Sequence, residues 1–275
     1  AKDAMGRQRI APKKVRGHIL RKRKAKEPKI IENAKVAMCI KGTSTSDIVN
    51  DFLHDMHSLK KPHSIMLTKK NPILPFEDEI SLEFLSEKND ANLFFFGNSN
   101  KKRPHNIVMG RMFDGHVLDM IELGITNYEK ISDFKGVGKR TGGRPLMLFE
   151  GQKWENDENL KKLRNIFIDF FRGEASPKVS LESLDHAMVL TAPENSGEIH
   201  FRNYLIAYKE SGSNVPDIEL IPMGPNADLS IRRKRFASSE LWREATARSF
   251  QLEPKKVKNK KVNEMMERVG RIHIG

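Results

Sequence analysis

The segment "AKVAMCIKGTSTSDIVNDFLHDMHSLKKP", residues Ala34–Pro62, decides the fold because it predicts a buried strand followed by an amphipathic helix. The apolar strand ends at Gly42, and the hydroxyl of Ser44 or Ser46 then caps the helix by accepting a hydrogen bond from a backbone N–H. Apolar side chains recur at helical spacing on one face until Lys-Lys-Pro ends the helix: Ile48, Val49, Phe52, Leu53, Met56 and Leu59.

The same order of elements returns later in the chain. "RPLMLFEG", residues Arg144–Gly151, predicts a strand, and "NDENLKKLRNIFIDFFRG", residues Asn156–Gly173, predicts a helix that ends at its glycine. The two units are joined by a stretch rich in glycine and basic residues that begins at Asp133. We therefore expect an α/β fold built from two related lobes.

The other segments extend each lobe. In the first part we expect strands at 64–68 and 91–98, a short helix at 81–88, and strand structure from the start of 105–125. In the second part we expect three strands, at 185–194, 198–211 and 217–233, and then one helix at 238–250. Cys39, in the first strand, is expected to be a buried and inert thiol.

Positive charge is concentrated at the two ends of the chain. The formal net charge is +13, yet residues 31–230 hold 24 Lys and Arg against 29 Asp and Glu. Residues 1–30 hold 12 against 2, and residues 231–275 hold 13 against 5. Basic arms on a nearly neutral body favour a polyanionic partner, because each cation near a phosphate releases condensed counterions. We expect nucleic acid rather than a membrane, since no apolar run is long enough to span a bilayer; the alternative is a pair of solvated tails.

Cysteine content and the first residues indicate the compartment. Cys39 is the only cysteine, so no disulfide can form within the chain and a reducing compartment is expected. The first residues lack the apolar centre of a secretory signal, and the basic run from Arg21 to Lys26 resembles a nuclear-import signal.

Enzymatic chemistry has weak support in the sequence. The glycine-rich stretch from Asp133 fits neither a P-loop nor a dinucleotide fingerprint, and no cofactor or small-molecule substrate is expected. His54, His57 and His63 lack further ligands at zinc-site spacing, so no metal is expected. One alternative is a Mg²⁺-dependent RNA-processing enzyme that uses the acids at 114, 119 and 122, although no second acidic cluster accompanies them. The candidate metal ligands in that case are Asp114, Asp119 and Glu122.

Basic side chains in turns and arms are the better candidates, because they can contact phosphates. Glycine among them lets backbone N–H groups approach an anion. Trp242 is the best candidate for stacking on a base. The expected RNA-binding residues are Arg21, Lys22, Arg23, Lys24, Lys101, Lys102, Arg103, Lys135, Lys139, Arg140, Arg144, Arg232, Arg233, Lys234, Arg235, Lys255 and Lys256.

Several strings have a familiar form: "EPKIIENAKVAMCIKG", "LFFFGNSNKKRPHNIVMGRMFDGHVLDMIELGI", "FKGVGKRTGGRPLMLFEG" and "IELIPMGPNADLSIRR". Together they resemble the Brix-domain family of ribosome-assembly factors, and within it the member tied to 5S ribosomal RNA. The resemblance implies a Brix domain at residues 28–236, with two lobes similar to anticodon-binding domains at about 31–134 and 145–235. A basic arm, 1–27, and a basic extension, 237–275, would flank it.

The resemblance also implies a function without catalysis. Such a factor binds 5S and large-subunit ribosomal RNA and pairs with the regulator of ribosome synthesis 1 homologue. Together they bring 5S RNA and its two ribosomal-protein companions into the nucleolar precursor of the large (60S) subunit. A protein-interaction scaffold whose arms serve only in nuclear import is a further alternative. The family motif carries over to Gly136, Gly138, Gly142, Gly143, Gly224, Pro225 and Leu229.

Overall fold

The protein is described here by a computed structural model that covers residues 33–134, 142–173, 184–212 and 215–247. Two short strands, β11 (Lys261–Val262) and β12 (Arg268–Val269), are also described and pair antiparallel with each other. Residues Glu32–Ala245 form one compact unit, and β11 and β12 belong to another. The predicted division into arm, domain and extension stays a prediction.

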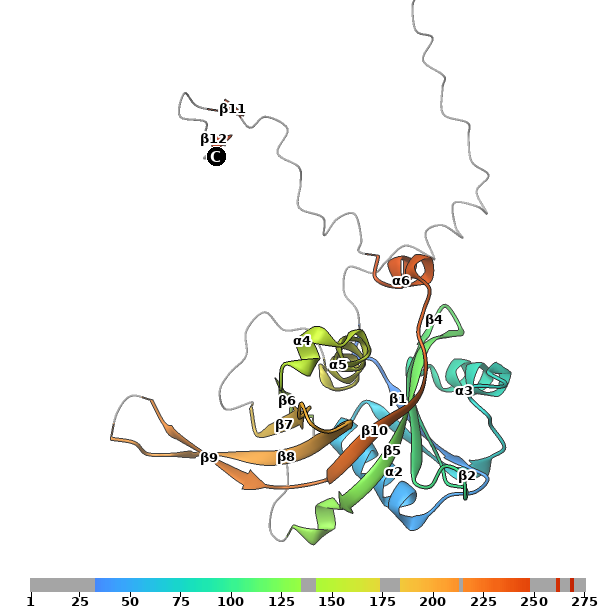
Figure 1. Cartoon of the computed structure of the whole chain (residues 1–275), viewed down its shortest axis with the longest axis horizontal. Helices are drawn as coiled ribbons and strands as arrows, with labels where there is room; N and C mark the ends of the chain where they lie inside the picture. Colours follow the sequence, from blue (N-terminus) through green and yellow to red (C-terminus); the bar gives the residue numbers. More distant parts are fainter. Residues whose placement is uncertain are drawn as a thin grey trace, which may run out of the picture. The chain divides into compact units, whose positions relative to one another are not determined.

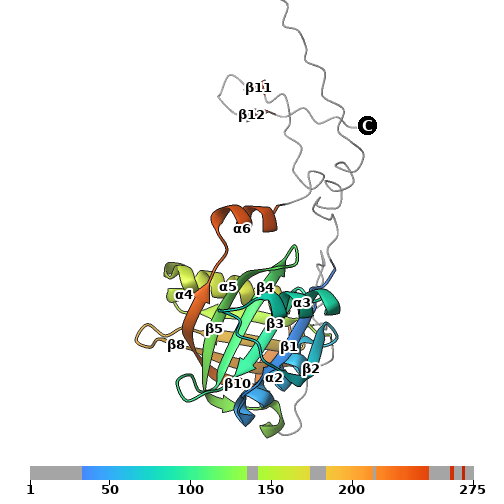
Figure 2. The same ribbon diagram turned by 90° about the vertical axis from the view of Figure 1, so that its right-hand side faces the viewer.

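A ten-stranded sheet runs through the larger unit in the order β2-β1-β3-β4-β5-β10-β8-β7-β6, with β9 pairing β8 (Figures 1 and 2). Its first half contains β1 (Ala37–Gly42), α2 (Asp47–Lys60), β2 (Ser64–Asn71), α3 (Ile80–Asn89), β3 (Leu93–Asn98), β4 (Asn106–Phe113) and β5 (His116–Glu129), followed by the 3-10 helix η1 (Ile131–Asp133). The second half contains β6 (Pro145–Glu150), α4 (Lys153–Asn156), α5 (Glu158–Phe171), β7 (His186–Thr191), β8 (Glu198–Lys209), β9 (Asp217–Pro222) and β10 (Asn226–Arg235), and α6 (Ser239–Ala245) follows.

The two halves repeat one pattern of strands. In the first half β1 is parallel to β3, which is followed by antiparallel β4 and β5. In the second half β6 is parallel to β7, which is followed by antiparallel β8 and β10. The halves meet where β5 pairs antiparallel with β10 at the centre of the sheet. The expected mixed α/β fold of two similar halves is confirmed.

One face of the sheet is covered along both halves. The apolar sides of α2 and α5 join a single core with the inward residues of β1, β3, β4, β5, β7 and β8. Aromatic contacts cross this core: the rings of Phe95 and Phe170 lie 4.4 Å apart, and those of Phe167 and Phe201 lie 6.1 Å apart. Gly97 is needed under α2, because a Cβ there would lie 2.5 Å from a methyl group of Val49.

The other face of the sheet is covered only in the first half. There α3 and the segment before it pack on a second core that includes Met38, Ile40, Phe94 and Phe96, each no more than 1% exposed. Figure 1 shows α3 beside the first half and α4 and α5 over the second. No helix within the described residues packs on the opposite face of β6, β7, β8 and β9.

This uncovered surface, called the open face below, follows from the strand registers. Leu146 of β6 lies beside Ala187 and Tyr204, and Leu148 lies beside Val189 and Arg202. Further along β8, Ile206 pairs with Leu220 and Tyr208 pairs with Ile218. Its apolar members are Leu146, Leu148, Val189, Tyr204, Ile206, Tyr208, Ile218 and Leu220.

Two expected elements differ from the sequence-based prediction. The predicted strand 217–233 is two strands, β9 and β10, because Gly224 turns the chain with a φ of +67°. A Cβ at Gly224 would lie 2.6 Å from the ring of Phe134, so only glycine fits this turn. The helix expected at 238–250 is shorter and ends at Ala245. Cys39 is 1% exposed as expected, and burial raises the pKa of its thiol to about 12.

Candidate nucleic-acid interface

The turn between β3 and β4 presents two exposed lysines, Lys101 and Lys102. The turn is fixed to the loop before α2 by two hydrogen bonds between Ser44 and Ser99. The backbone N–H of Ser99 donates to the carbonyl of Ser44, and the Ser44 hydroxyl donates to the carbonyl of Ser99, both at 2.8 Å. The two lysines are therefore held beside the start of α2.

Three more lysines lie along the same edge of the sheet. β2, β1 and β3 are parallel, so their carboxyl ends meet at one edge. Lys41 at the end of β1 pairs in register with Lys70 of β2, and Lys69 and Lys70 are exposed. We call Lys41, Lys69, Lys70, Lys101 and Lys102 the cationic edge. Sequence reasoning missed the first three, although the "LTKKN" segment at the end of a strand could have indicated them.

The start of α2 adds to the positive potential of the cationic edge. The Ser46 hydroxyl accepts a hydrogen bond from the backbone N–H of Val49 and lies 2.8 Å from Nδ1 of His105. The other N–H groups at a helix start carry partial positive charge and attract anions. The arrangement suits the phosphates of a nucleic-acid backbone, which are read by charge and not by base identity.

Arg103 differs from its two lysine neighbours, because it faces an acid inside the protein. Its Nη1 lies 3.5 Å from Oε1 of Glu122, a carboxylate that is completely buried. The same carboxylate oxygen accepts a hydrogen bond of 2.7 Å from Asn106. Arg103 therefore pairs with a buried acid of the fold, and its charge is partly neutralised there.

The four basic residues at the end of β10 also have partners within the protein. Arg232 donates to the side-chain oxygen of Asn106 at 3.0 Å, and Lys234 donates to that of Asn159 at 2.7 Å. Arg233 and Arg235 form ion pairs with acids, namely Glu122 and Glu77 for the first and Glu79 for the second. The hydrogen bond to Glu122 raises the pKa of Arg233. The three arginines therefore join β10 to the first half of the fold, and Lys234 joins it to α5.

The remaining predicted residues are spread over the chain. Arg144 is half-buried at the start of β6, where it lies beside Gly173. Gly142 has a φ of +84°, and a Cβ at Gly143 would lie 2.6 Å from the carboxylate of Asp185. Pro225 and Leu229 are buried. The residues that fall outside the described ones are Arg21, Lys22, Arg23, Lys24, Lys135, Gly136, Gly138, Lys139, Arg140, Lys255 and Lys256.

The three acids of the alternative metal site do not share one location. Asp114 is exposed in the turn between β4 and β5. Asp119 is 3% exposed and binds Arg111 with both carboxylate oxygens, whereas Glu122 is held by Asn106 and the arginines described above. Across the described part of the chain, no group of three His, Cys, Asp or Glu side chains could hold a metal ion.

Arg111 is the centre of a buried charge network. Besides Asp119, its guanidinium donates to Asn165 and to Asp169 of α5, each at 2.6 Å. Burial by itself would raise the pKa of Asp169, but Lys35 at 3.0 Å and Arg111 lower that pKa below its usual value. Trp242, the candidate for base stacking, lies instead over the Arg111 guanidinium, 5.0 Å from it.

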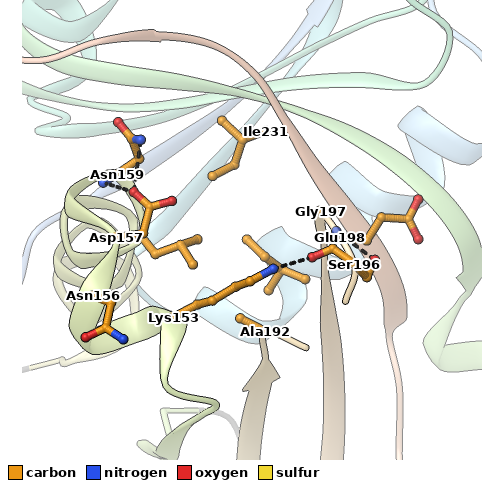
Figure 3. Close-up of a pocket in the computed structure, with 11 residues that line it drawn as sticks. Lys153, Asn156, Asp157, Asn159, Ala192, Ser196, Gly197, Glu198 and Ile231 are labelled. Carbon is orange, nitrogen blue, oxygen red and sulfur yellow. Dashed lines mark hydrogen bonds between the residues drawn. The ribbon is translucent and has the colours of Figure 1, made fainter. Parts of the chain in front are cut away.

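One pocket among the described residues lies where α4, α5, the β7–β8 turn and β10 meet (Figure 3). It has a volume of about 450 Å³ and an apolar floor made by Leu160, Ala192, Ile199 and Ile231. Lys153 is the basic side chain that lines it, and it donates to the carbonyl of Ser196 at 2.7 Å. None of the predicted RNA-binding residues lines this pocket.

The open face is an exposed apolar surface that sequence reasoning missed. Leu146 and Leu148 are each 42% exposed, and Ile218 is 65% exposed. The sequence signal is the strand Pro145–Glu150, whose apolar run is typical of a strand buried on both faces, with only one helix following it. Among the helices of the described residues, none is long and apolar enough to cross a membrane.

The chain is similar to known proteins over most of its length. The family model described as the Brix domain matches residues 42–233. The ribosome production factor 2 homologue of Mus musculus is 45% identical over 234 residues, which are 85% of this chain and 76% of that protein. The homologue of Schizosaccharomyces pombe is 43% identical over 256 residues, which are 90% of this chain and 81% of that protein.

One solved structure, that of a probable ribosomal biogenesis protein from Aeropyrum pernix K1, is 11% identical with a TM-score of 0.48 and covers 74% of this chain and 99% of that one. The relatives by sequence are ribosome production factors, so this chain is a ribosome biogenesis factor, and the family points to an assembly factor without enzymatic activity. The chain belongs to the Brix-domain family, within its group of ribosome production factor 2 homologues.

Proposed function

We propose that this chain is a non-catalytic assembly factor of the nucleolus that joins RNA to protein in the precursor of the large ribosomal subunit. It binds 5S and large-subunit ribosomal RNA through the cationic edge and the basic arms. It pairs with the regulator of ribosome synthesis 1 homologue through the open face. Together the pair recruits 5S RNA and its two ribosomal proteins.

The open face is the observation that carries this proposal. Its apolar side chains are contiguous across β6, β7, β8 and β9, and the equivalent surface of the first half is buried under α3. Monomeric proteins rarely leave such a contiguous apolar surface in water, so it marks a place where another protein binds. A partner helix would play the part that α3 plays in the first half.

Polar groups at one side of the open face can orient the partner. In the strand register Leu148 of β6 lies beside Val189 of β7, which lies beside Arg202 of β8. The guanidinium of Arg202 donates a hydrogen bond to Asp228 at 2.7 Å. His200 Nδ1 lies 2.6 Å from the same carboxylate. Burial by itself would raise the pKa of Asp228, but its hydrogen bonds lower that pKa. The carboxylate therefore stays ionised at neutral pH.

An edge strand offers a second mode of contact. β6 ends the sheet, and no strand within the described residues pairs with its outer side. An extended segment of a partner can add to such an edge through main-chain hydrogen bonds, while pockets on the adjoining face select its side chains. The open face and the β6 edge adjoin each other, so one partner can use both.

Substitution on the open face tests the protein pairing. Leu146→Ser with Leu148→Ser removes two apolar contacts, each of which costs about 2 kcal/mol if it is a hot spot of the interface. We expect the dissociation constant for the regulator of ribosome synthesis 1 homologue to rise at least about 100-fold, as measured by calorimetry. Lys161→Ser with Lys162→Ser, two lysines of α5 on the other side of the sheet, is the control. Equal affinity of wild type and the double leucine variant would refute the assignment of this surface.

Charge reversal at the cationic edge tests the RNA part. Lys101→Glu with Lys102→Glu should weaken binding of 5S RNA and reduce the slope of log affinity against log salt by about 2, because each phosphate contact contributes about one unit. Lys88→Glu with Lys209→Glu makes the same change of charge at lysines outside the cationic edge. If both double variants lose affinity equally, only net charge matters and the edge is not the contact.

A further inference from the structure

Helix α3 has apolar side chains on opposite sides. Leu82, which is completely buried, and Leu85 face the sheet, whereas Ile80 and Phe84 are 73% and 56% exposed. Ile80 and Phe84 are one helical turn apart and therefore lie on the same outer side. A helix that is apolar on both sides is typically buried on both sides. The outer side of α3 thus has the character of an interface.

The surroundings of Ile80 and Phe84 are strongly acidic. Residues 72–90 hold six acids and one base, in a chain whose formal net charge is +13. The carboxylates repel phosphates, so this side of the protein is unsuited to RNA or to an anionic lipid surface. The acids are Glu77, Asp78, Glu79, Glu83, Glu87 and Asp90, and the base is Lys88.

The α3 surface already binds basic side chains of this chain. Glu77 accepts from Arg233 at 3.3 Å, and Glu79 binds Arg235. The ammonium of Lys88 lies 5.6 Å from the centre of the Phe84 ring, which is a favourable position for a cation over an aromatic face. These contacts use part of the acidic charge, and Asp78 and Glu87 remain exposed.

We propose that the outer side of α3 is a second protein-docking surface, which binds a lysine- and arginine-rich segment of a partner protein. Apolar side chains of that segment, spaced three or four residues apart, contact Ile80, Phe84 and the 57% exposed Leu74. Its basic side chains pair with Asp78 and Glu87. The surface is separate from the open face and does not depend on the partner proposed there.

A synthetic peptide probes this surface directly. The probe is a 16-residue helical peptide with leucines at helical spacing and lysines elsewhere, and its binding to the full chain is followed by fluorescence anisotropy. Ile80→Ser with Phe84→Ser should raise the dissociation constant at least tenfold, and Glu87→Lys should raise it severalfold at low salt. Val215→Ser and Glu158→Lys, an exposed apolar residue and an exposed acid outside both docking surfaces, are the control pair and should leave it unchanged. Thermal unfolding of each variant establishes that it is folded.

Three results would overturn the proposal. The first is a dissociation constant that the α3 double substitution leaves within twofold of the wild-type value, or that the control pair raises equally. The second is a loss of 5S RNA affinity in the α3 double variant, which would assign the surface to RNA. The third is carbodiimide cross-linking, in the full chain alone, of lysines from residues 1–31 to Asp78 or Glu87, which would assign it to the chain's own arm.

Discussion

The two halves of the sheet share a strand pattern and differ in what covers it. In the first half, the face of the sheet opposite α2 is covered: Met38, Phe94 and Phe96 are buried there under α3 and the segment before it. In the second half, the corresponding face leaves Leu146 and Leu148 each 42% exposed. The difference arises because β2 and α3 lie between β1 and β3, while no described strand or second covering helix lies between α5 and β7. One strand pattern is thus covered on its second face in the first half and leaves apolar side chains exposed there in the second.

The covered face unites the halves. Phe95 of β3 contacts Phe170 of α5, so the helix of the second half packs on a strand of the first. Arg111 of β4 and Asp169 of α5 add a partly buried ion pair to the same contact. We therefore expect the halves to unfold together, even though only one of them has a complete second layer.

The largest effect is expected from Arg111→Met. The substitution leaves the buried Asp119 without its counter-charge and removes one of the two counter-charges of the partly buried Asp169, the other being Lys35. Breaking a buried pair in this way costs about 3–5 kcal/mol. Urea unfolding measures the loss. Arg164→Met is the matched control, because Arg164 pairs with Glu155 at the surface and should cost less than about 1 kcal/mol. Similar losses in the two variants would mean that the halves are not joined through Arg111.

The second prediction compares the face that α3 covers in the first half with the open face of the second half. Ile40→Ala, at a fully buried position of β1, should lower the free energy of unfolding by about 2–5 kcal/mol. Leu148→Ala, in β6, should lower it by less than about 1 kcal/mol, because the side chain is already partly in water. Urea unfolding of the two variants checks this order. A large loss from Leu148→Ala would mean that the open face is covered within the chain itself.

The smallest expected change in stability concerns Lys60, the last residue of α2. Its ammonium group interacts electrostatically with Asp169 of the second half. Desolvation lowers the pKa of this buried lysine to about 8, against the opposing attraction of Asp169. Above pH 8 the folded state has lost the proton that the unfolded state keeps until about pH 10.4, so stability should rise with pH across this window.

Lys60→Met should therefore be about 1–3 kcal/mol more stable than wild type at pH 7, since an apolar side chain replaces a desolvated charge. It should also remove the rise in stability between pH 8 and pH 10. Unfolding by urea at pH 7 and at pH 9.5 measures both effects. A wild-type stability that is flat or falls over this interval would contradict the prediction.

The fold could be predicted from the sequence where periodicity is strong. The helix face from Ile48 to Leu59 and the helix before Gly173 appear as expected, because apolar spacing records burial directly. The break at Gly224 was missed, since alternating apolar residues continue on both sides of it. A turn inside a run of strand-forming residues depends on a tertiary contact, here with Phe134, that no local pattern contains.

The candidate site was less accessible to sequence reasoning. Charge runs do not reveal which cations pair within the fold, so Arg232 to Arg235 were grouped with Lys101 and Lys102 although their surroundings differ. The cationic edge gathers residues from two strands and the β3–β4 turn, and only the parallel pairing of β1 with β2 brings Lys41 beside Lys70. The open face could not be predicted for a related reason. The apolar sequence of β6 does not show whether a helix of the same chain covers each of its two faces. The RNA-binding role of these residues stays a prediction.

The edge strand β6 has a consequence for how the protein must be made. Within the described residues no strand pairs with the outer side of β6, and a leucine-bearing edge strand of this kind is a template on which identical chains can stack. If the proposed partner covers β6, copies synthesised in excess of that partner should precipitate or be degraded, whereas co-expression should keep them in solution. Matched production of the two polypeptides, and not the inherent solubility of this one, would then set how much of it accumulates in a cell.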